Sequence, residues 1–146
     1  MVWSNGKAYF FSGVRYVRFD LAAGRVDGAF PRAIAAFWRG GIDAGLVWNN
    51  GKAYFFKGAE YIRYDLARDS ADPGYPKSIA SGWKGLWPDG VDGACVGRDG
   101  AAYFFKGGDS IRHDMTADEC EAPQPIEARW PGVLASLGPS PDDDIA

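Results

Sequence analysis

Gly6-Lys7-Ala8-Tyr9-Phe10-Phe11-Ser12-Gly13 is the stretch that decides the fold, because the chain contains two further copies of it. It returns as the segment 51–58, GKAYFFKG, and again as the segment 100–107, GAAYFFKG. Self-similarity with a period of 45 to 49 residues is the signature of a solenoid, a propeller or an array. The chain is therefore expected to consist of tandem copies of one small unit.

Three further elements accompany the aromatic run in the copies. A second strand after a glycine turn is predicted at residues 16–20, 61–65 and 110–114. The motif Pro-x-x-Ile-x-x-x-Trp-x-Gly has an i, i+4 apolar pair between a proline and a glycine, which predicts a short amphipathic helix or helical turn. It occupies residues 31–40, 76–85 and 123–132. A strand containing small residues precedes the aromatic run, at 42–48 in the second copy and 91–96 in the third.

Local signals arrange these strands into a sheet. Asn-Gly or Asp-Gly, at residues 5–6, 50–51 and 99–100, predicts a tight hairpin between the first strand and the aromatic strand. The Tyr-Phe-Phe run does not alternate with polar residues, which is typical of a middle strand covered on both faces. Small residues in the first strand suit the close approach of several strands around a narrow axis, so these strands are expected innermost.

The first copy lacks most of its inner strand, and the other end of the chain supplies a match. Joining residues 144–146 to residues 1–3 gives Asp-Ile-Ala-Met-Val-Trp, which corresponds position by position to residues 43–48. The expected organisation is one domain of three repeats, at 2–40, 41–86 and 87–134. Residues 142–146 are then expected to complete the inner strand of the first blade, as in a circular permutation, so that the ring has no free edge.

Composition excludes several kinds of partner. The net charge is −3, with 16 basic and 19 acidic residues interspersed, so the clustered positive charge that nucleic acid requires is missing. No apolar stretch approaches the roughly 20 residues that cross a bilayer, and no basic region followed by an apolar run marks an export signal. A soluble protein with no membrane partner is expected, and both a secreted and a cytoplasmic location stay open. Cys95 and Cys120 are too few for a disulfide framework, and whether they form one bridge stays open.

Taken together, the four elements resemble the hemopexin repeat in order, spacing and residue type, over nearly the whole chain. The resemblance implies an all-β fold of four-stranded antiparallel propeller blades with a short helix between blades. It also implies a central channel lined by the first strands. The family includes haem-binding serum proteins, non-catalytic domains of matrix metalloproteinases and plant seed albumins. This chain departs from the four repeats of the family, because it has three; it is expected to be a fragment, a three-bladed ring or a ring that assembles with other copies.

The resemblance also suggests a metal site at the channel. Asp43, Asp92 and Asp144 occur once per repeat at the channel end of the inner strand. Main-chain or side-chain oxygens at these positions could ring a cation such as calcium or sodium, since hard cations favour oxygen ligands. The alternative is that each aspartate binds backbone amides where a strand starts or the chain turns.

His113 is the chain's one histidine and a candidate haem ligand. It stands where the other copies have Phe19 and Tyr64, so the alternative is that it replaces an aromatic ring in packing. No recognised motif places a serine or cysteine nucleophile beside this histidine, and phosphate-binding glycine loops are absent. The chain is therefore not expected to be an enzyme.

The sequence thus leaves two functional hypotheses. The first is a non-catalytic propeller that binds a small ligand or a protein, with a cation in its channel and, less favoured, haem. The second is a structural, self-assembling propeller fragment, natural or engineered, whose main property is homo-oligomer formation. The identity of the ligand is beyond the sequence.

Overall fold

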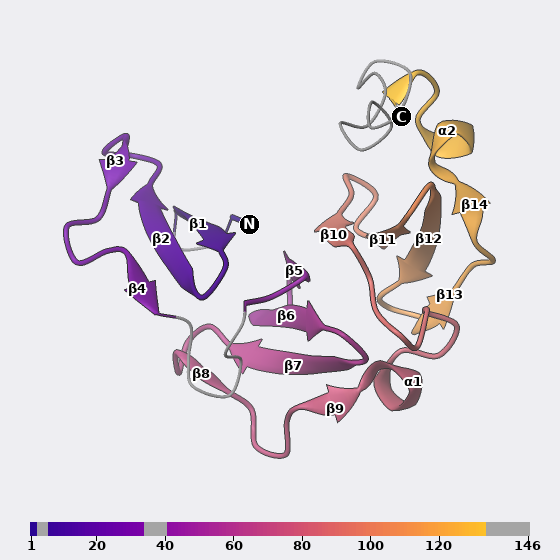
Figure 1. The fold of residues 1–146 in the computed structure, drawn as a ribbon, viewed down its shortest axis with the longest axis horizontal. Coiled ribbons are helices and arrows are strands. Elements are labelled where there is room, and N and C mark those ends of the chain that lie inside the picture. The colour runs from indigo at the N-terminus through magenta and orange to yellow at the C-terminus, as the bar shows by residue number, and fades with distance from the viewer. Residues whose placement is uncertain (3–5, 34–40, 134–146) are drawn as a thin grey trace, which may run out of the picture.

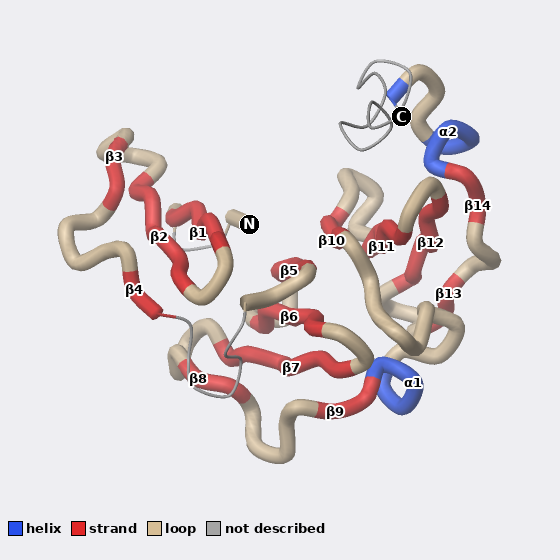
Figure 2. Tube along the Cα trace, viewed as in Figure 1, coloured by secondary structure: helices blue, strands red, loops and turns tan. Residues whose placement is uncertain are grey.

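The computed structural model describes residues 1–2, 6–33 and 41–133, and in this part the chain is all-β with two one-turn helices. Its strands form three antiparallel sheets, one for each sequence repeat. Figure 1 shows the sheets as three blades in an arc, with blade 2 between blades 1 and 3 and an opening between the outer two. The inner strands of blades 2 and 3 lie nearest the centre of the arc, and the short outer strands lie on its rim (Figure 2). The predicted all-β fold class is confirmed.

Blade 2 contains all the elements that the repeat predicts. Four of its strands follow one another from the centre outward, and a fifth, two-residue strand pairs with the other end of the third strand. They are β5 (Ala44–Val47), β6 (Lys52–Lys57), β7 (Glu60–Asp65), β8 (Ser70–Ala71) and β9 (Lys77–Ser78). Gly51 closes the first hairpin with a φ of 76°, a conformation that glycine adopts without strain, as the Asn-Gly signal predicts.

Blade 3 repeats this topology. Its strands are β10 (Gly93–Val96), β11 (Ala102–Lys106), β12 (Asp109–Asp114), β13 (Glu119–Cys120) and β14 (Gln124–Pro125). The register is the same as well: Tyr54 lies opposite Arg63 in blade 2, and Tyr103 lies opposite Arg112 in blade 3. The inner strands β5 and β10 lie next to each other, which agrees with their predicted place at the centre.

Blade 1 consists of β1 (Lys7–Ser12), β2 (Arg15–Asp20), β3 (Arg25–Val26) and β4 (Arg32–Ala33). Met1 and Val2 occupy the inner position beside β1. Val2 forms a bridge with Ala8, and the Tyr9 amide donates to the Met1 carbonyl at 2.7 Å. Val2 and Met1 thus take the positions that Val47 and Leu46 take in the inner strand of blade 2. The predicted remainder of the strand, 142–146, lies outside the described residues, so its completion and the three repeat boundaries stay predictions.

The helical turns that the motif predicts are present in blades 2 and 3. They are α1 (Ile79–Gly82) and α2 (Ile126–Arg129), and each begins three residues after its proline because β9 or β14 comes between. The Ser78 side chain accepts from the Ser81 amide and caps α1. Helix α1 then ends at Gly82, and the amide of the next residue, Trp83, donates to the Ile79 carbonyl. The motif of the first copy lies mostly outside the described residues.

The core lies between the blades. One buried cluster joins blade 2 to blade 3 around Phe56, Trp83 and Phe104. A second cluster joins blade 1 to blade 2 around Tyr9 and Phe55. The Tyr-Phe-Phe run therefore packs on both faces of the middle blade, as its lack of alternation predicts.

Candidate functional site

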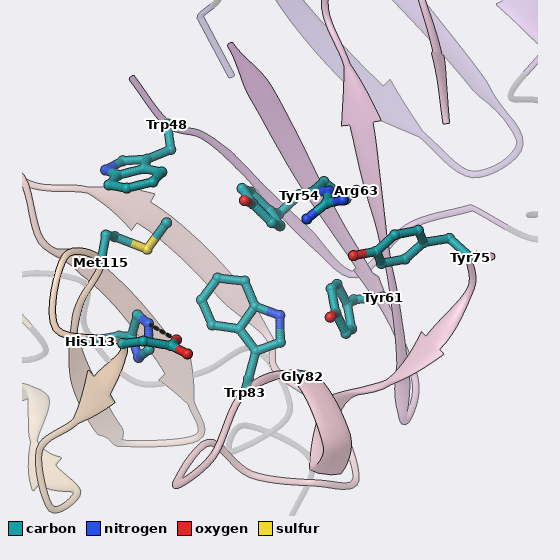
Figure 3. Close-up of a pocket in the computed structure, with 10 residues that line it drawn as sticks. Trp48, Tyr54, Tyr61, Arg63, Tyr75, Gly82, Trp83, His113 and Met115 are labelled. Carbon is teal, nitrogen blue, oxygen red and sulfur yellow. Dashed lines mark ion pairs between the residues drawn. The ribbon is translucent and has the colours of Figure 1, made fainter. Parts of the chain in front are cut away.

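A pocket of about 200 Å³ opens between blades 2 and 3. Five of the residues that line it are tyrosine or tryptophan, and the others include one arginine, one histidine, one methionine and one aspartate. The lining residues are Trp48, Tyr54, Tyr61, Arg63, Tyr75, Gly82, Trp83, His113, Met115 and Asp118. Figure 3 shows them converging on one space from β5–β9 and α1 on one side and from the end of β12 on the other. We call this space the aromatic pocket.

Blade 2 supplies one wall through the register of its strands. Tyr61 and Arg63 are two residues apart on β7, so they share a face, and Tyr54 lies directly opposite Arg63 on β6. Trp83 follows the short helix and packs edge-on against Tyr54, with 5.4 Å between ring centroids. The short helix therefore sets the indole against the face of the sheet that these side chains cover.

The Trp83 side chain carries the clearest chemical signal in the pocket. Trp83 is only 4% exposed, and its ring also contacts Phe104 at 5.3 Å and His113 at 4.9 Å. Its Nε1 is buried and has no hydrogen-bond partner among the described parts of the chain. Figure 3 shows this nitrogen on the side of the ring that faces Tyr61 and Arg63. A buried donor without an acceptor costs about 1–3 kcal/mol, which makes this nitrogen a candidate contact for an oxygen in the pocket.

Arg63 is held in place beside the pocket by an ion pair. Its Nε donates to Oδ2 of Asp72 at 2.6 Å, and its guanidinium lies 5.4 Å from the centre of the Tyr75 ring. Lys52 and Arg68 also bind Asp72, whose side chain is 5% exposed. The hydrogen bond from Arg63, followed by that from Lys52, lowers the pKa of Asp72. The network fixes a positive charge at the pocket wall.

Tyr61 and Tyr75 complete this wall. Their rings pack edge-on with 5.4 Å between centroids. Burial of Tyr61 raises its pKa, and its hydrogen bond with Tyr75 raises it further. The Tyr61 hydroxyl is therefore neutral at physiological pH.

His113 forms part of the opposite wall and is 1% exposed. Its Nδ1 lies 3.2 Å from Cys120 Sγ, and its Nε2 lies 3.3 Å from Oδ1 of Asp118. Burial lowers its pKa, although the Asp118 charge opposes this, so the ring is neutral at pH 7. Tyr64 donates in the same way to Asp69 at 2.8 Å one repeat earlier. The geometry agrees with an aromatic packing role, and haem ligation by His113 stays a prediction.

The pocket depends on residues in which the second repeat differs from the third. Gly82 leaves room for the Tyr61 ring, because a Cβ at this position would collide with the Tyr61 hydroxyl. Blade 3 has Arg129 and Ser110 at these positions, and Arg129 Nε donates to Ser110 Oγ at 3.1 Å. Sequence reasoning missed this pocket except for His113. The sequence signal that could have located the pocket is the Gly82 and Tyr61 pair, because the third repeat has different residues at these two positions.

The predicted channel aspartates lie at a second hollow, of about 470 Å³, between the starts of β5 and β10. Asp43 Oδ2 accepts from the Gly58 amide at 2.8 Å, and Asp92 Oδ2 accepts from the Gly107 amide at 2.7 Å. The structure therefore brings Asp43 and Asp92 to one hollow and gives both the backbone-binding role. Asp144 lies outside the described residues.

The hollow only partly fits a metal ion. Asp89 also lines it but forms an ion pair with Lys106, which lowers the pKa of Asp89. Within residues 1–2, 6–33 and 41–133, no group of three or more histidine, cysteine, aspartate or glutamate side chains is placed to hold a metal. Any cation here would depend on the second oxygens of Asp43 and Asp92 and on main-chain carbonyls, so the site stays a prediction.

Both cysteines are free thiols. Burial is the main cause that raises the pKa of Cys120 to about 11, and burial also raises the pKa of Cys95. Since the thiolate is the reactive form, neither cysteine is activated as a nucleophile.

Comparison with known proteins identifies the family. The hemopexin family model matches residues 2–41 and 42–88, which together exceed half of the chain, so the chain belongs to the hemopexin family. The third repeat has the same strand order and register in the structure although the family model does not match it. A search of curated proteins finds no match.

Solved structures with the hemopexin fold are similar to the chain. The hemopexin fold protein CP4 from cow pea has a TM-score of 0.76 at 24% identity, covering 92% of this chain and 69% of that chain. The seed albumin LS24 from Lathyrus sativus has a TM-score of 0.79 at 24% identity, covering 90% and 67%. A plant lectin with two metal binding sites, from Cicer arietinum, has a TM-score of 0.78 at 23% identity, covering 92% and 69%.

These similarities establish the fold. Among the helices that the structure describes, none has the length and apolar character of a membrane span.

Proposed function

We propose that the chain is a non-catalytic binding module of the hemopexin type and that the aromatic pocket is its ligand site. The observation that carries this proposal is the Trp83 indole N–H, which is buried without an acceptor beside the pocket. Ligand pockets are typically apolar and aromatic, with a few polar groups that orient the ligand. The rings around Trp83 supply the apolar part, and Arg63, Asp118 and the indole N–H supply the polar part.

The ligand that suits this pocket is a single sugar ring. The volume of about 200 Å³ is smaller than the roughly 300–1,000 Å³ of pockets for drug-sized molecules. Aromatic faces cover the apolar face of a sugar, while Trp83 and Arg63 donate to its oxygens. Asp118, whose side chain is 78% exposed, accepts from its hydroxyls. Two similar structures from Cicer arietinum support this class, since one is described as a lectin and the other as an albumin showing hemagglutination.

The groups in the pocket support binding more than catalysis. The ring nitrogens of His113 are engaged by Cys120 and Asp118, and burial lowers its pKa. The nearby Cys120 thiol, with its pKa of about 11, stays protonated. Asp118 is the one acidic residue among those that line the pocket, whereas glycoside hydrolysis uses a pair of carboxylates.

Calorimetry with a panel of neutral, acidic and N-acetylated monosaccharides tests the proposal, with benzoate as a non-sugar ring. A binding sugar is expected to shift the Trp83 indole N–H signal in ¹⁵N NMR spectra. Asp118→Asn should weaken sugar binding roughly tenfold, because it removes a charge-assisted hydrogen bond. Asparagine tolerates the positive φ of 57° at this position.

Asp69→Asn is the matched control. Asp69 has a φ of 53°, binds Tyr64 as Asp118 binds His113, and does not line the pocket. Equal affinities of the two variants, or a Trp83 signal that no ligand moves, would contradict the proposal. Binding of benzoate without any sugar would contradict the sugar class.

We further propose that the hollow beside Asp43 and Asp92 holds a hard cation in the complete channel, with Asp144 as the third predicted contributor. The shared hollow of the first two residues supports this, as does the description of one similar structure as having two metal binding sites. Millimolar calcium should then raise the melting temperature, and Asp43→Asn with Asp92→Asn should remove the increase. A melting temperature that is the same in calcium, sodium and chelator would exclude the site.

A further inference from the structure

The ion-pair network behind the aromatic pocket contains more cations than carboxylates. Three basic side chains surround Asp72, and both oxygens of its buried carboxylate accept hydrogen bonds from them. They are Lys52, Arg63 and Arg68. The second carboxylate is that of Asp65, which pairs with Lys52 at 2.8 Å and with Arg68 at 3.4 Å. Three basic side chains thus share two acidic ones, so one positive charge is not neutralised within the network.

The equivalent networks of the other two blades are balanced among the described residues, with two basic and two acidic side chains each. They are formed by Lys7, Arg18, Asp20 and Asp27 in blade 1, and by Arg112, Arg129, Asp99 and Glu121 in blade 3. The difference is Arg68, because the other repeats have Ala23 and Ala117 at this position. The extra cation therefore occurs in blade 2, the blade that supplies most of the aromatic pocket.

Arg63 brings positive charge to the pocket wall. Its Nε donates to Asp72 at 2.6 Å, whereas its two terminal nitrogens have no hydrogen-bond partner in residues 1–2, 6–33 and 41–133. Figure 3 shows the guanidinium between the side chains of Tyr54 and Tyr75, on the side of the pocket that the Trp83 indole nitrogen faces. The ion pair through Nε holds the group in place, so the terminal N–H groups are offered to a ligand in a fixed orientation.

We propose that the aromatic pocket prefers an acidic monosaccharide, a hexuronic acid whose carboxylate binds the terminal nitrogens of Arg63. This inference rests on the proposed function of the pocket as a sugar site. A carboxylate suits a guanidinium better than a hydroxyl does, because two parallel charge-assisted hydrogen bonds form. The carboxylate of a hexuronate is a small group outside a ring of ordinary hexose size, so it suits the same volume of about 200 Å³.

Asp118 orients such a ligand and does not exclude it. This carboxylate lies 3.3 Å from His113, on the wall opposite Arg63, and its side chain is 78% exposed. Solvent and salt therefore screen its repulsion of the ligand carboxylate. With one charge of each sign on the two walls, the sugar is held with its carboxylate toward Arg63 and its hydroxyls toward Asp118.

Calorimetry with matched pairs of sugars tests the preference. Glucose and glucuronate differ only at C6, as do galactose and galacturonate. At least one uronate is expected to bind roughly tenfold more tightly than its parent hexose, the effect of adding a charge-assisted pair of hydrogen bonds. Added salt should reduce this preference by screening the charges, and it should leave the affinity for the hexose nearly constant.

Two substitutions in blade 2 test the source of the preference. Arg63→Gln should abolish it, and Arg63→Lys should keep only part of it, because lysine keeps the charge without the planar fork. Arg68→Ala introduces the residue of the other two repeats and retains every residue that lines the pocket. It should reduce the preference roughly twofold to threefold, since the extra cation is lost at a distance from the ligand.

Arg18→Gln is the matched control. Arg18 forms the equivalent ion pair with Asp27 in blade 1 and does not line the pocket, so its loss should leave the preference for the uronate unchanged.

The outcomes separate this inference from the proposed function. If no monosaccharide binds, both fail. Hexoses that bind as tightly as their uronates and still shift the Trp83 N–H signal overturn the acidic preference alone. A preference that persists in folded Arg63→Gln overturns the role of Arg63. Should circular dichroism show that Arg63→Gln does not fold, Arg68→Ala and the salt series decide, and a preference that neither of them reduces overturns the inference.

Discussion

Blades 1 and 3 present the same strand pairing with opposite degrees of burial. Phe10 pairs with Val17 in blade 1, and Phe104 pairs with Ile111 in blade 3, at equivalent positions of the two sheets. Yet Phe104 is fully buried against Phe56 and Trp83, while Phe10 is mostly exposed. The repeated sequence therefore specifies the sheet, and the neighbouring blade decides which of its residues form the core.

Replacing each of the two phenylalanines by alanine should give the largest change in stability that tests this comparison. Phe104→Ala should lower the free energy of unfolding by about 3–5 kcal/mol, because it leaves a cavity between blades 2 and 3. Phe10→Ala should lower it by roughly 1 kcal/mol or less in the monomer, since little packing is lost at an exposed position. Urea unfolding at a concentration where the chain is monomeric measures both values, and equal losses would contradict the difference in burial.

The contact points between blades give a second test. A Cβ on Gly90 would lie 2.9 Å from the carbonyl oxygen of Gly58, and Gly90 has a φ of 135°. Gly90→Ala should therefore lower stability by roughly 1–3 kcal/mol through overpacking, in addition to the cost of its backbone conformation. Gly100→Ala is the matched comparison, because Gly100 has a φ of 79° but open space around its Cβ position.

Gly100→Ala should lower the stability by only the roughly 1–2 kcal/mol that a left-handed conformation costs a residue with a side chain. Thermal unfolding of both variants measures the difference. A Gly90 variant as stable as the Gly100 variant would show that blades 2 and 3 can separate at this point without cost. Gly41 approaches the carbonyl of Gly13 in the same way, so the same contact recurs between blades 1 and 2.

The strands could be predicted from the sequence because their signals are local. The glycine turns and the unbroken aromatic run located β6 and β11, and small residues located the inner strands β5 and β10. The proline motif located the helical turns, but β9 and β14 within it were not predicted, because their pairing with the second strand is a contact across the blade.

The aromatic pocket could not be predicted in the same way. It depends on Gly82 and Tyr61 of one blade meeting His113 of the next, and no local pattern states which residues of two repeats will face each other. The channel aspartates were located by their repetition, and Asp43 and Asp92 do share a hollow. Whether they bind a cation depends on backbone carbonyls, which carry no sequence signal.

An ion pair that recurs within blade 1 and within blade 2 gives a third test, in which these two blades should behave alike. Lys7 pairs with Asp20 in blade 1, and Lys52 pairs with Asp65 at 2.8 Å in blade 2. The lysine hydrogen bond is the main cause that lowers the pKa of each aspartate to about 2. A lowered carboxyl pKa adds stability above the unfolded value of roughly 3.9, and this stability is lost as the pH falls toward 2.

Urea midpoints measured between pH 5 and pH 2 should therefore decrease with acid. Asp65→Asn and Asp20→Asn should each remove a similar part of that decrease, although the side chains are partly exposed and solvent screening keeps the effect small. A much larger effect in one blade would mean that the ion pair depends on the neighbouring blade after all.

His113 gives the smallest and most local test, at the interface that blade 1 lacks. Burial lowers its pKa below the ordinary value of 6.5, and the charges of Asp118 and Asp114 oppose this shift. The unfolded chain therefore binds a proton more readily than the folded chain as the pH falls below 6.5, so stability is full above that value and decreases below it. His113→Gln should flatten the urea midpoint between pH 7 and pH 5, apart from a constant offset for lost packing. Asp118→Asn should steepen it, because the carboxylate that stabilises the charged ring is gone. An unchanged pH dependence in both variants would mean that His113 is accessible to solvent, which is incompatible with its burial between blades 2 and 3.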